Sequence, residues 1–99
     1  MVSQKIPIWQ LEPIPAKIQC TLVTKGLHKD EYSVQFIGDG ESFTAFVPSA
    51  YVDVANKRIM VSVVAEFDDN YLIDLPVDTL TSGPRIRLPK TSKVLILQR

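Results

Sequence analysis

The chain has 99 residues, of which 45% are hydrophobic and 22% are charged, as is typical of one folded domain with a single core. Eleven basic side chains balance eleven acidic ones, which excludes the strong positive charge of a general nucleic-acid or anionic-membrane binder. No run approaches the roughly eighteen apolar residues of a membrane span, so no membrane partner is expected. The lone Cys20 cannot form an internal disulfide, and the first residues lack the apolar run of a signal peptide, so we expect a cytoplasmic location.

Residues 1–15 form a proline-rich segment in which Pro7, Pro13 and Pro15 interrupt a series of apolar side chains. Prolines at this density favour an extended chain. Burying the ring of Trp9 would stabilise the fold by about 2 to 3 kcal/mol, and this stabilisation is absent if the segment does not pack. We therefore expect residues 1–15 to pack as an extended arm on a β-barrel domain formed by residues 16–99; the alternative is an unpacked leader.

The rest of the chain is predicted to be β-structure, because apolar and polar side chains alternate with the period of a half-buried strand. The sequence Gly38-Asp39-Gly40 predicts a tight hairpin, since these residues accept positive φ. Pro76 is expected to end a strand, because proline has no N–H for a ladder. No segment shows the three-to-four spacing of apolar residues that an amphipathic helix requires. Short 3₁₀ turns are expected within 49–56 and 78–82. The expected strands cover residues 18–22, 32–36, 42–47, 58–67, 71–75, 84–88 and 93–98, of which 58–67 is expected to be central and covered on both faces.

Residues 18–54 and 61–96 follow one pattern of three strands, in which the second opens on Tyr32 or Tyr71 and the third ends in Pro48 or Pro89. A three-stranded unit of about forty residues cannot bury its apolar face alone, whereas two such units can close on each other. The halves are either a true duplication or two meanders that share a pattern. We expect an all-β fold of about seven short antiparallel strands in a strongly bent sheet or small barrel.

The segment Phe46-Val47-Pro48-Ser49-Ala50-Tyr51-Val52 resembles the end of an SH3 domain, where an apolar strand runs into Pro-Ser-x-Tyr-Val and a 3₁₀ turn before the last strand. The resemblance implies an SH3-like small barrel. In that family the proline and tyrosine help to line a groove for proline-rich ligands, which would correspond to Pro48 and Tyr51. SH3 domains also carry a tryptophan pair where this chain has Val34-Gln35-Phe36, and their Ala-Leu-Tyr-Asp-Tyr stretch has no counterpart at 21–25. The resemblance therefore supports the topology and leaves the ligand groove unsupported.

Residues suited to catalysis are few. Cys20 shares a strand face with Ile18 and Leu22, as expected for a buried small hydrophobe, and His28 lies in a polar turn where it should be solvated. The acids between residues 66 and 78 lack the glycine and ligand spacing of a calcium loop. No phosphate-binding glycine loop or paired metal-ligand cysteines occur. We expect no catalytic residues, no metal site and no cofactor.

Charge is sorted along the chain. Residues 66–78 contain acids and no base, whereas residues 83–99 contain bases and no acid. Arg85 and Arg87 project from one face of their strand, because strand side chains repeat every two residues. Either this strand pairs with the acidic one, so that Arg85 or Arg87 faces Asp74, or the arginines form a patch for an acidic partner such as a phosphate backbone.

Two classes of function follow. The first is a non-enzymatic protein-interaction or regulatory module that binds a protein partner, or a second copy through an exposed strand edge; its expected binding residues are Trp9, Tyr32, Pro48 and Tyr51. The second is a small-barrel nucleic-acid binder whose basic strand 85–93 supplies Arg85, Arg87, Lys90 and Lys93, with Phe43, Phe46 or Tyr71 as stacking platforms. We predict the first, because the net charge is zero. Aromatic side chains exposed beside prolines would favour the first class, and those beside the two arginines the second.

Overall fold

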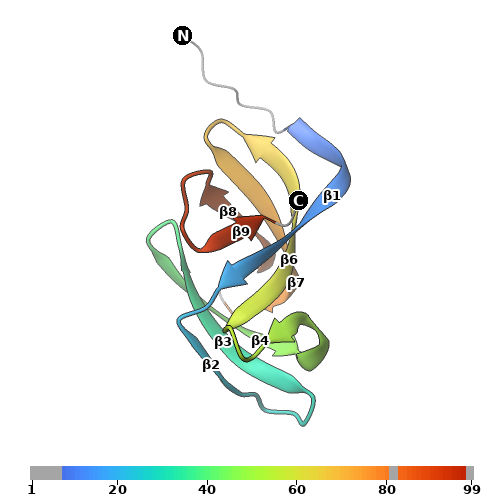
Figure 1. Ribbon diagram of the computed structural model, residues 1–99, viewed down its shortest axis with the longest axis vertical. Helices are drawn as coiled ribbons and strands as arrows, with labels where there is room; N and C mark the ends of the chain where they lie inside the picture. Colours follow the sequence, from blue (N-terminus) through green and yellow to red (C-terminus); the bar gives the residue numbers. More distant parts are fainter. Residues whose placement is uncertain (1–7, 81–82, 98–99) are drawn as a thin grey trace.

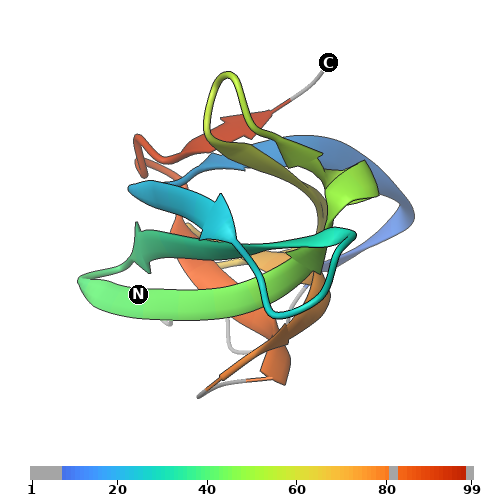
Figure 2. The same ribbon diagram turned by 90° about the horizontal axis from the view of Figure 1, so that it is seen from below.

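The computed structural model describes residues 8–80 and 83–97. Within these ranges the chain forms one nine-stranded sheet whose pairings are all antiparallel. The sheet is strongly curled into a half-barrel (Figure 1). Figure 2, which looks along the long axis, shows the ribbon curving around the interior. No helix in the described part of the chain is long and apolar enough to cross a membrane.

The strand order in the sheet is β2-β3-β4-β7-β6-β1-β9, with β5 added to β6 and β8 added to β7. The expected all-β fold with a strongly bent antiparallel sheet is confirmed; the structure adds the short β5 and divides the strand expected at 18–22 between β1 and β2, so that the expected seven strands become nine within the described residues. The bounds are β1 (Ile8–Gln19), β2 (Leu22–Lys25), β3 (Glu31–Gly38), β4 (Glu41–Pro48), the 3₁₀ turn η1 (Ser49–Tyr51), β5 (Val52–Asp53), β6 (Arg58–Phe67), β7 (Asn70–Thr79), β8 (Gly83–Pro89) and β9 (Leu95–Leu97).

Two meanders of three strands each, β2-β3-β4 and β6-β7-β8, make up most of the sheet. They join where Ala45 of β4 pairs with Thr79 of β7, and they share one core. The rings of Phe36 and Phe43 stack in this core with their centroids 5.3 Å apart. The six residues expected in the core are at most 7% exposed, which confirms that the two halves close on each other: Val34, Phe36, Val61, Val63, Ile73 and Ile86.

Residues 8–15 of the proline-rich segment belong to a strand of the sheet, while the rest of the expected arm, residues 1–7, lies outside the described residues. From Ile8 to Gln19, β1 pairs with β6, and its last part also pairs with β9. The register with β6 is interrupted between Trp9 and Ile14, where Pro13 lacks an N–H to donate. Trp9 lies opposite Ala65 of β6. It is 54% exposed, so the expected burial of its ring is wrong, and pairing with β6 holds this segment instead.

The expected turns are largely present. Asp39 and Gly40 connect β3 to β4 with φ angles of +50° and +79°, which confirms the predicted hairpin. A 3₁₀ turn follows β4 as expected. The second predicted 3₁₀ turn is wrong at Asp78 and Thr79, which belong to β7, while residues 81–82 lie outside the described residues.

Three strand predictions are wrong in part. The strand expected at 18–22 is broken, because the N–H of Cys20 donates to the carbonyl of Lys57 and the N–H of Thr21 to that of Gln35 (2.7 and 2.8 Å), so the chain passes from β1 to a new strand. The strand β6 is central but not covered on both faces, since Met60 is exposed.

The third error concerns Pro76. The strand β7 does not end there but continues to Thr79, because its far end is taken up by β4. The N–H of Leu80 also donates to the carbonyl of Thr44 at 2.9 Å. Pro76 does lie in the gap of the ladder to β8, between Asp74 and Thr79, and the backbone of β7 stays extended through it.

Candidate functional site

The sheet forks where β6 and β7 separate. The ladder between these strands ends at the pair formed by Ser62 and Asp74. Beyond this pair the two strands have different partners. Ile59 and Arg58 of β6 pair with β5, while Thr79 of β7 pairs with β4. Pro76 lies in the diverging part of β7, where its ring nitrogen could not have continued the ladder. We call this opening the fork.

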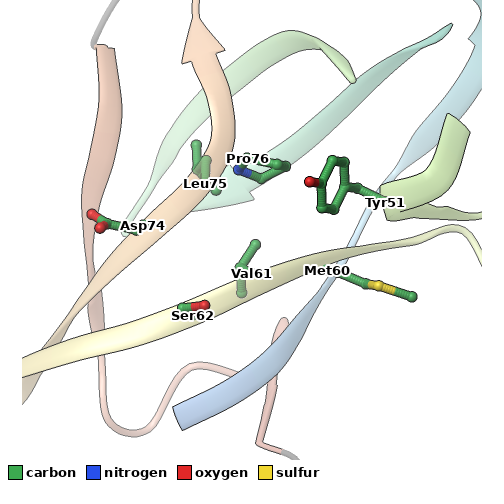
Figure 3. A pocket seen from close by; sticks show the side chains of 7 residues that line it. All are labelled: Tyr51, Met60, Val61, Ser62, Asp74, Leu75 and Pro76. Carbon is green, nitrogen blue, oxygen red and sulfur yellow. The ribbon is translucent and has the colours of Figure 1, made fainter. Parts of the chain in front are cut away.

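A hollow of about 240 Å³ lies in the fork (Figure 3). Its floor includes the buried side chains of Val61 and Leu75. Tyr51 lies beside Pro76 on one side (Figure 3), and Tyr51 and Met60 are each 45% exposed. The thioether of Met60 points away from the other lining side chains (Figure 3). A half-exposed aromatic ring at an apolar floor suits the insertion of an apolar side chain. The full lining is Tyr51, Met60, Val61, Ser62, Asp74, Leu75 and Pro76.

Local hydrogen bonds hold Tyr51 in place. The N–H of Ser49, the first residue of η1, donates to the carbonyl of Asp30 at 2.8 Å, and the N–H of Val52 closes the turn on the Ser49 carbonyl. The Asp53 carboxylate then accepts hydrogen bonds from the side-chain amide and backbone N–H of Asn56, at 2.9 and 3.2 Å. These bonds lower the pKa of Asp53, and they fix the turn between β5 and β6. Tyr51 is therefore presented by an ordered segment.

Asp74, at the rim of the fork, connects it to a second cluster. Arg85 lies opposite Asp74 in the register of β7 and β8, and its Nε and Nη2 atoms donate to the two carboxylate oxygens at 2.6 and 3.1 Å. This hydrogen bonding raises the pKa of Arg85. The guanidinium carbon lies 5.1 Å from the ring centroid of Trp9, within cation–π range. The predicted pairing of an arginine with Asp74 is confirmed.

The other basic residues differ in their surroundings. Lys90 Nζ lies 3.7 Å from a carboxylate oxygen of Glu66 and 5.5 Å from the ring centroid of Tyr71. Arg87 and Lys93 are exposed, and neither has an ion pair with any residue in 8–80 or 83–97. Acids therefore offset two of the four bases that were predicted to bind a polyanion.

The four residues expected to bind a protein do not form one surface patch around the fork. Tyr51 lines it, but Trp9 belongs to the Arg85 cluster. Tyr32 lies partly buried against the core, opposite Val47. Pro48 is exposed but does not line the hollow.

Sequence reasoning missed Met60 and Pro76 as neighbours of Tyr51. Both carried a usable signal. Met60 is an apolar residue on the face of β6 that also carries Ser62, Val64 and Glu66, and Pro76 is a proline within a strand pattern. The exposed aromatic beside a proline, expected for a protein-interaction module, is thus formed by Tyr51 with Pro76. The exposed ring of Trp9 beside Arg85 meets the criterion set for a nucleic-acid binder, although Asp74 offsets the charge of that arginine.

The nucleophile and base candidates lie apart from the fork. Cys20 is buried, as predicted, its thiol lies 3.7 Å from the carbonyl of Ile18, and burial raises its pKa to about 11. His28 is exposed in the loop between β2 and β3, as predicted for a turn residue. Among residues 8–80 and 83–97, no three His, Cys, Asp or Glu side chains gather as metal ligands would.

No protein-family model, curated protein or solved structure matches the chain.

Proposed function

We propose that the chain is a non-enzymatic protein-interaction module that receives an apolar side chain of a partner protein in the fork. The observation that carries this proposal is the half-exposed ring of Tyr51 beside Pro76 at a hollow with an apolar floor. Tyrosine is enriched at protein interfaces, and anchor side chains that fill such hollows contribute most of the binding energy. The polar rim at Ser62 would orient the partner.

The proposal includes an SH3-like relationship at the level of topology. Its support is local: β4 runs into Pro48, the 3₁₀ turn Ser49–Tyr51 follows, and β5 begins directly after it. The order of these elements is the one that the resemblance implied. The fork uses Tyr51 with Pro76 rather than with Pro48, so the ligand preference of that family is not carried over.

Binding of single-stranded nucleic acid is the second candidate. Its support is the half-exposed ring of Trp9 next to Arg85, with the exposed Arg87 two residues further along the strand. We rank it second, because Asp74 and Glu66 offset two of the bases and the net charge is zero.

A selection of peptides from a random library displayed on phage, with the chain as immobilised target, tests the proposed function. Selected peptides should share an apolar anchor residue, and Tyr51→Ala should weaken their binding at least about tenfold, which corresponds to about 1.4 kcal/mol. The matched control is Ile37→Ala, which removes a similarly exposed apolar side chain of β3 outside the fork. Failure to select any binding peptide, or equal affinity for the wild type and the Tyr51→Ala variant, would refute the proposal.

Two further measurements separate the alternatives. Light scattering of the purified chain reports whether a second copy is the partner. Retention on heparin at about 50 mM salt tests for a polyanion site, because screening is weak at that concentration. We expect no retention. Salt-sensitive binding that is lost in an Arg85→Ala, Arg87→Ala double variant would promote the nucleic-acid function.

A further inference from the structure

A second opening of the sheet lies between β8 and the hairpin of β3 and β4; we call it the seam. Among residues 8–80 and 83–97, β8 pairs with β7 alone, and β4 pairs with β7 only at Ala45. Within the described part of the chain no ladder joins β4 to β8. A hollow of about 200 Å³ lies in the seam, lined by Asp39, Glu41, Phe43, Arg85, Ile86 and Arg87.

The backbone of β8 presents hydrogen-bonding groups to the seam at Arg85 and Arg87. In an antiparallel strand, alternate residues direct both their N–H and their C=O to the same edge. The N–H of Lys90 donates to the carbonyl of Asp69 on the β7 side, at 2.7 Å. Arg85 and Arg87 lie five and three residues before Lys90. Because both numbers are odd, their backbone groups face the edge of β8 away from β7. By this alternation neither backbone N–H belongs to the ladder with β7, and neither takes part in the hydrogen bonds found in the turns and loops of the described residues.

Pro89 limits the length of this free edge. It lies two residues after Arg87, so its backbone nitrogen faces the same edge and cannot donate a hydrogen bond. Such a proline protects an edge from indiscriminate pairing. The edge is therefore suited to a short added strand.

The charges of the seam select the sequence of that strand. The side chains of Arg85 and Arg87 are exposed on one wall, and the acids Asp39 and Glu41 lie on the other. A second copy of β8 would place guanidinium groups opposite one another, which is unfavourable. A strand with acidic side chains on its outward face would instead meet opposite charge at Arg87, which has no ion pair in the described residues.

We propose that the seam binds an extended segment of a partner protein, which adds to β8 as an antiparallel strand. Apolar and acidic residues alternate in this segment, because one face lies over Phe43 and Ile86 and the other faces the arginines. A basic residue occupies its amino-terminal end. An antiparallel strand begins at the carboxyl end of β8, where Leu88 lies against Gly38 and thus close to the acidic hairpin tip.

The probe is the peptide acetyl-Lys-Val-Glu-Val-Glu-Val-amide, titrated into the full chain and followed by amide NMR spectra and hydrogen exchange. The amides of Arg85 and Arg87 should shift, and their exchange should slow at least about tenfold when the peptide saturates. Methylation of the backbone nitrogens of both glutamates should abolish binding, because these nitrogens donate to β8.

Charge reversal supplies the matched variants. Arg87→Glu should weaken binding of the probe at least about tenfold and should favour a peptide with its lysine and glutamates exchanged. Lys93→Glu makes the same change of charge outside the seam and should leave affinity unchanged. The proposal is overturned if about 1 mM probe leaves the two arginine amides unshifted, if the methylated peptide binds equally well, or if Arg87→Glu has no effect. Since Tyr51 lies outside the seam, Tyr51→Ala should not alter this binding, and either proposal can fail without the other.

Discussion

Replacing Gly38 with alanine is expected to destabilise the fold through overpacking where the hairpin of β3 and β4 meets β8. An added Cβ would lie 2.6 Å from Leu88 Cδ2 and 3.2 Å from Phe43 Cε2, whereas carbon atoms attract best at about 3.5 to 4.0 Å. Leu88 is fully buried and cannot move without displacing its neighbours. Overpacking of this kind costs about 1 to 3 kcal/mol. Alanine also restricts the unfolded chain more than glycine does, which offsets about 0.4 to 1 kcal/mol of the overpacking cost. We therefore expect the free energy of unfolding to fall by about 1 to 2 kcal/mol.

Urea unfolding of a double-mutant cycle tests the cause of this loss. Leu88→Val removes the clashing Cδ2 atom and alone should cost about 1 kcal/mol. The double variant Gly38→Ala, Leu88→Val should lose about 1 kcal/mol less free energy of unfolding than the sum of the two single variants, because the clash is gone.

Gly40→Ala is the matched control in the same hairpin. No atom lies within 4 Å of its Cβ position, but its φ is +79°, so alanine there costs backbone strain alone. Its effect should add to that of Leu88→Val within about 0.5 kcal/mol. Unchanged stability of the Gly38→Ala variant, or strict additivity of its cycle with Leu88, would show that the hairpin does not pack against β8 as described.

Three further predictions concern the core, the amino-terminal segment and the buried thiol. Val63→Ala should lower the free energy of unfolding by about 1 to 3 kcal/mol in urea, because Val63 is fully buried; a smaller change would contradict a closed core. Deleting residues 1–15 should lower the melting temperature, because the pairing of Ile8 and Ile14 with β6 is lost; an unchanged melting curve would show that this segment adds nothing. The Cys20 thiol ionises near its ordinary pKa of 9.0 when unfolded and near 11 when folded, so its contribution to stability should be complete below pH 9 and decline as the pH rises to 11. Urea unfolding across this range should show that decline in the wild type, and an equal decline in Cys20→Ala would refute it.

Local chemistry made parts of the fold predictable from the sequence. The hairpin at Asp39 and Gly40 was found because these residues accept positive φ where few others do. The core positions were found because burial repeats every second residue along each strand. The pairing of Arg85 with Asp74 followed from opposite charges on strands adjacent in the chain. Each of these features depends on residues that lie close together in the sequence.

The surroundings of Tyr51 were not predictable in this way. A local motif indicated Tyr51 and the 3₁₀ turn that carries it. Its place beside Pro76 at the hollow depends on where β6 leaves β7 and on the pairing of Ala45 with Thr79, which joins distant parts of the chain. For the same reason Pro76 was taken as the end of a strand: without β4, nothing in the local pattern would keep that segment extended.

Both proposed binding surfaces have one structural origin, the interruption of a ladder in a strongly curled sheet. Where pairing is continuous, backbone groups are satisfied and side chains close over the core, so a partner meets only individual exposed side chains. At the fork, β6 and β7 diverge beyond Ser62 and leave a hollow with an apolar floor. At the seam, β8 lacks a second neighbour within the described residues, and the backbone groups of Arg87 face the opening. The fork therefore favours recognition of an apolar side chain, whereas the seam favours recognition of an extended backbone with matching charge.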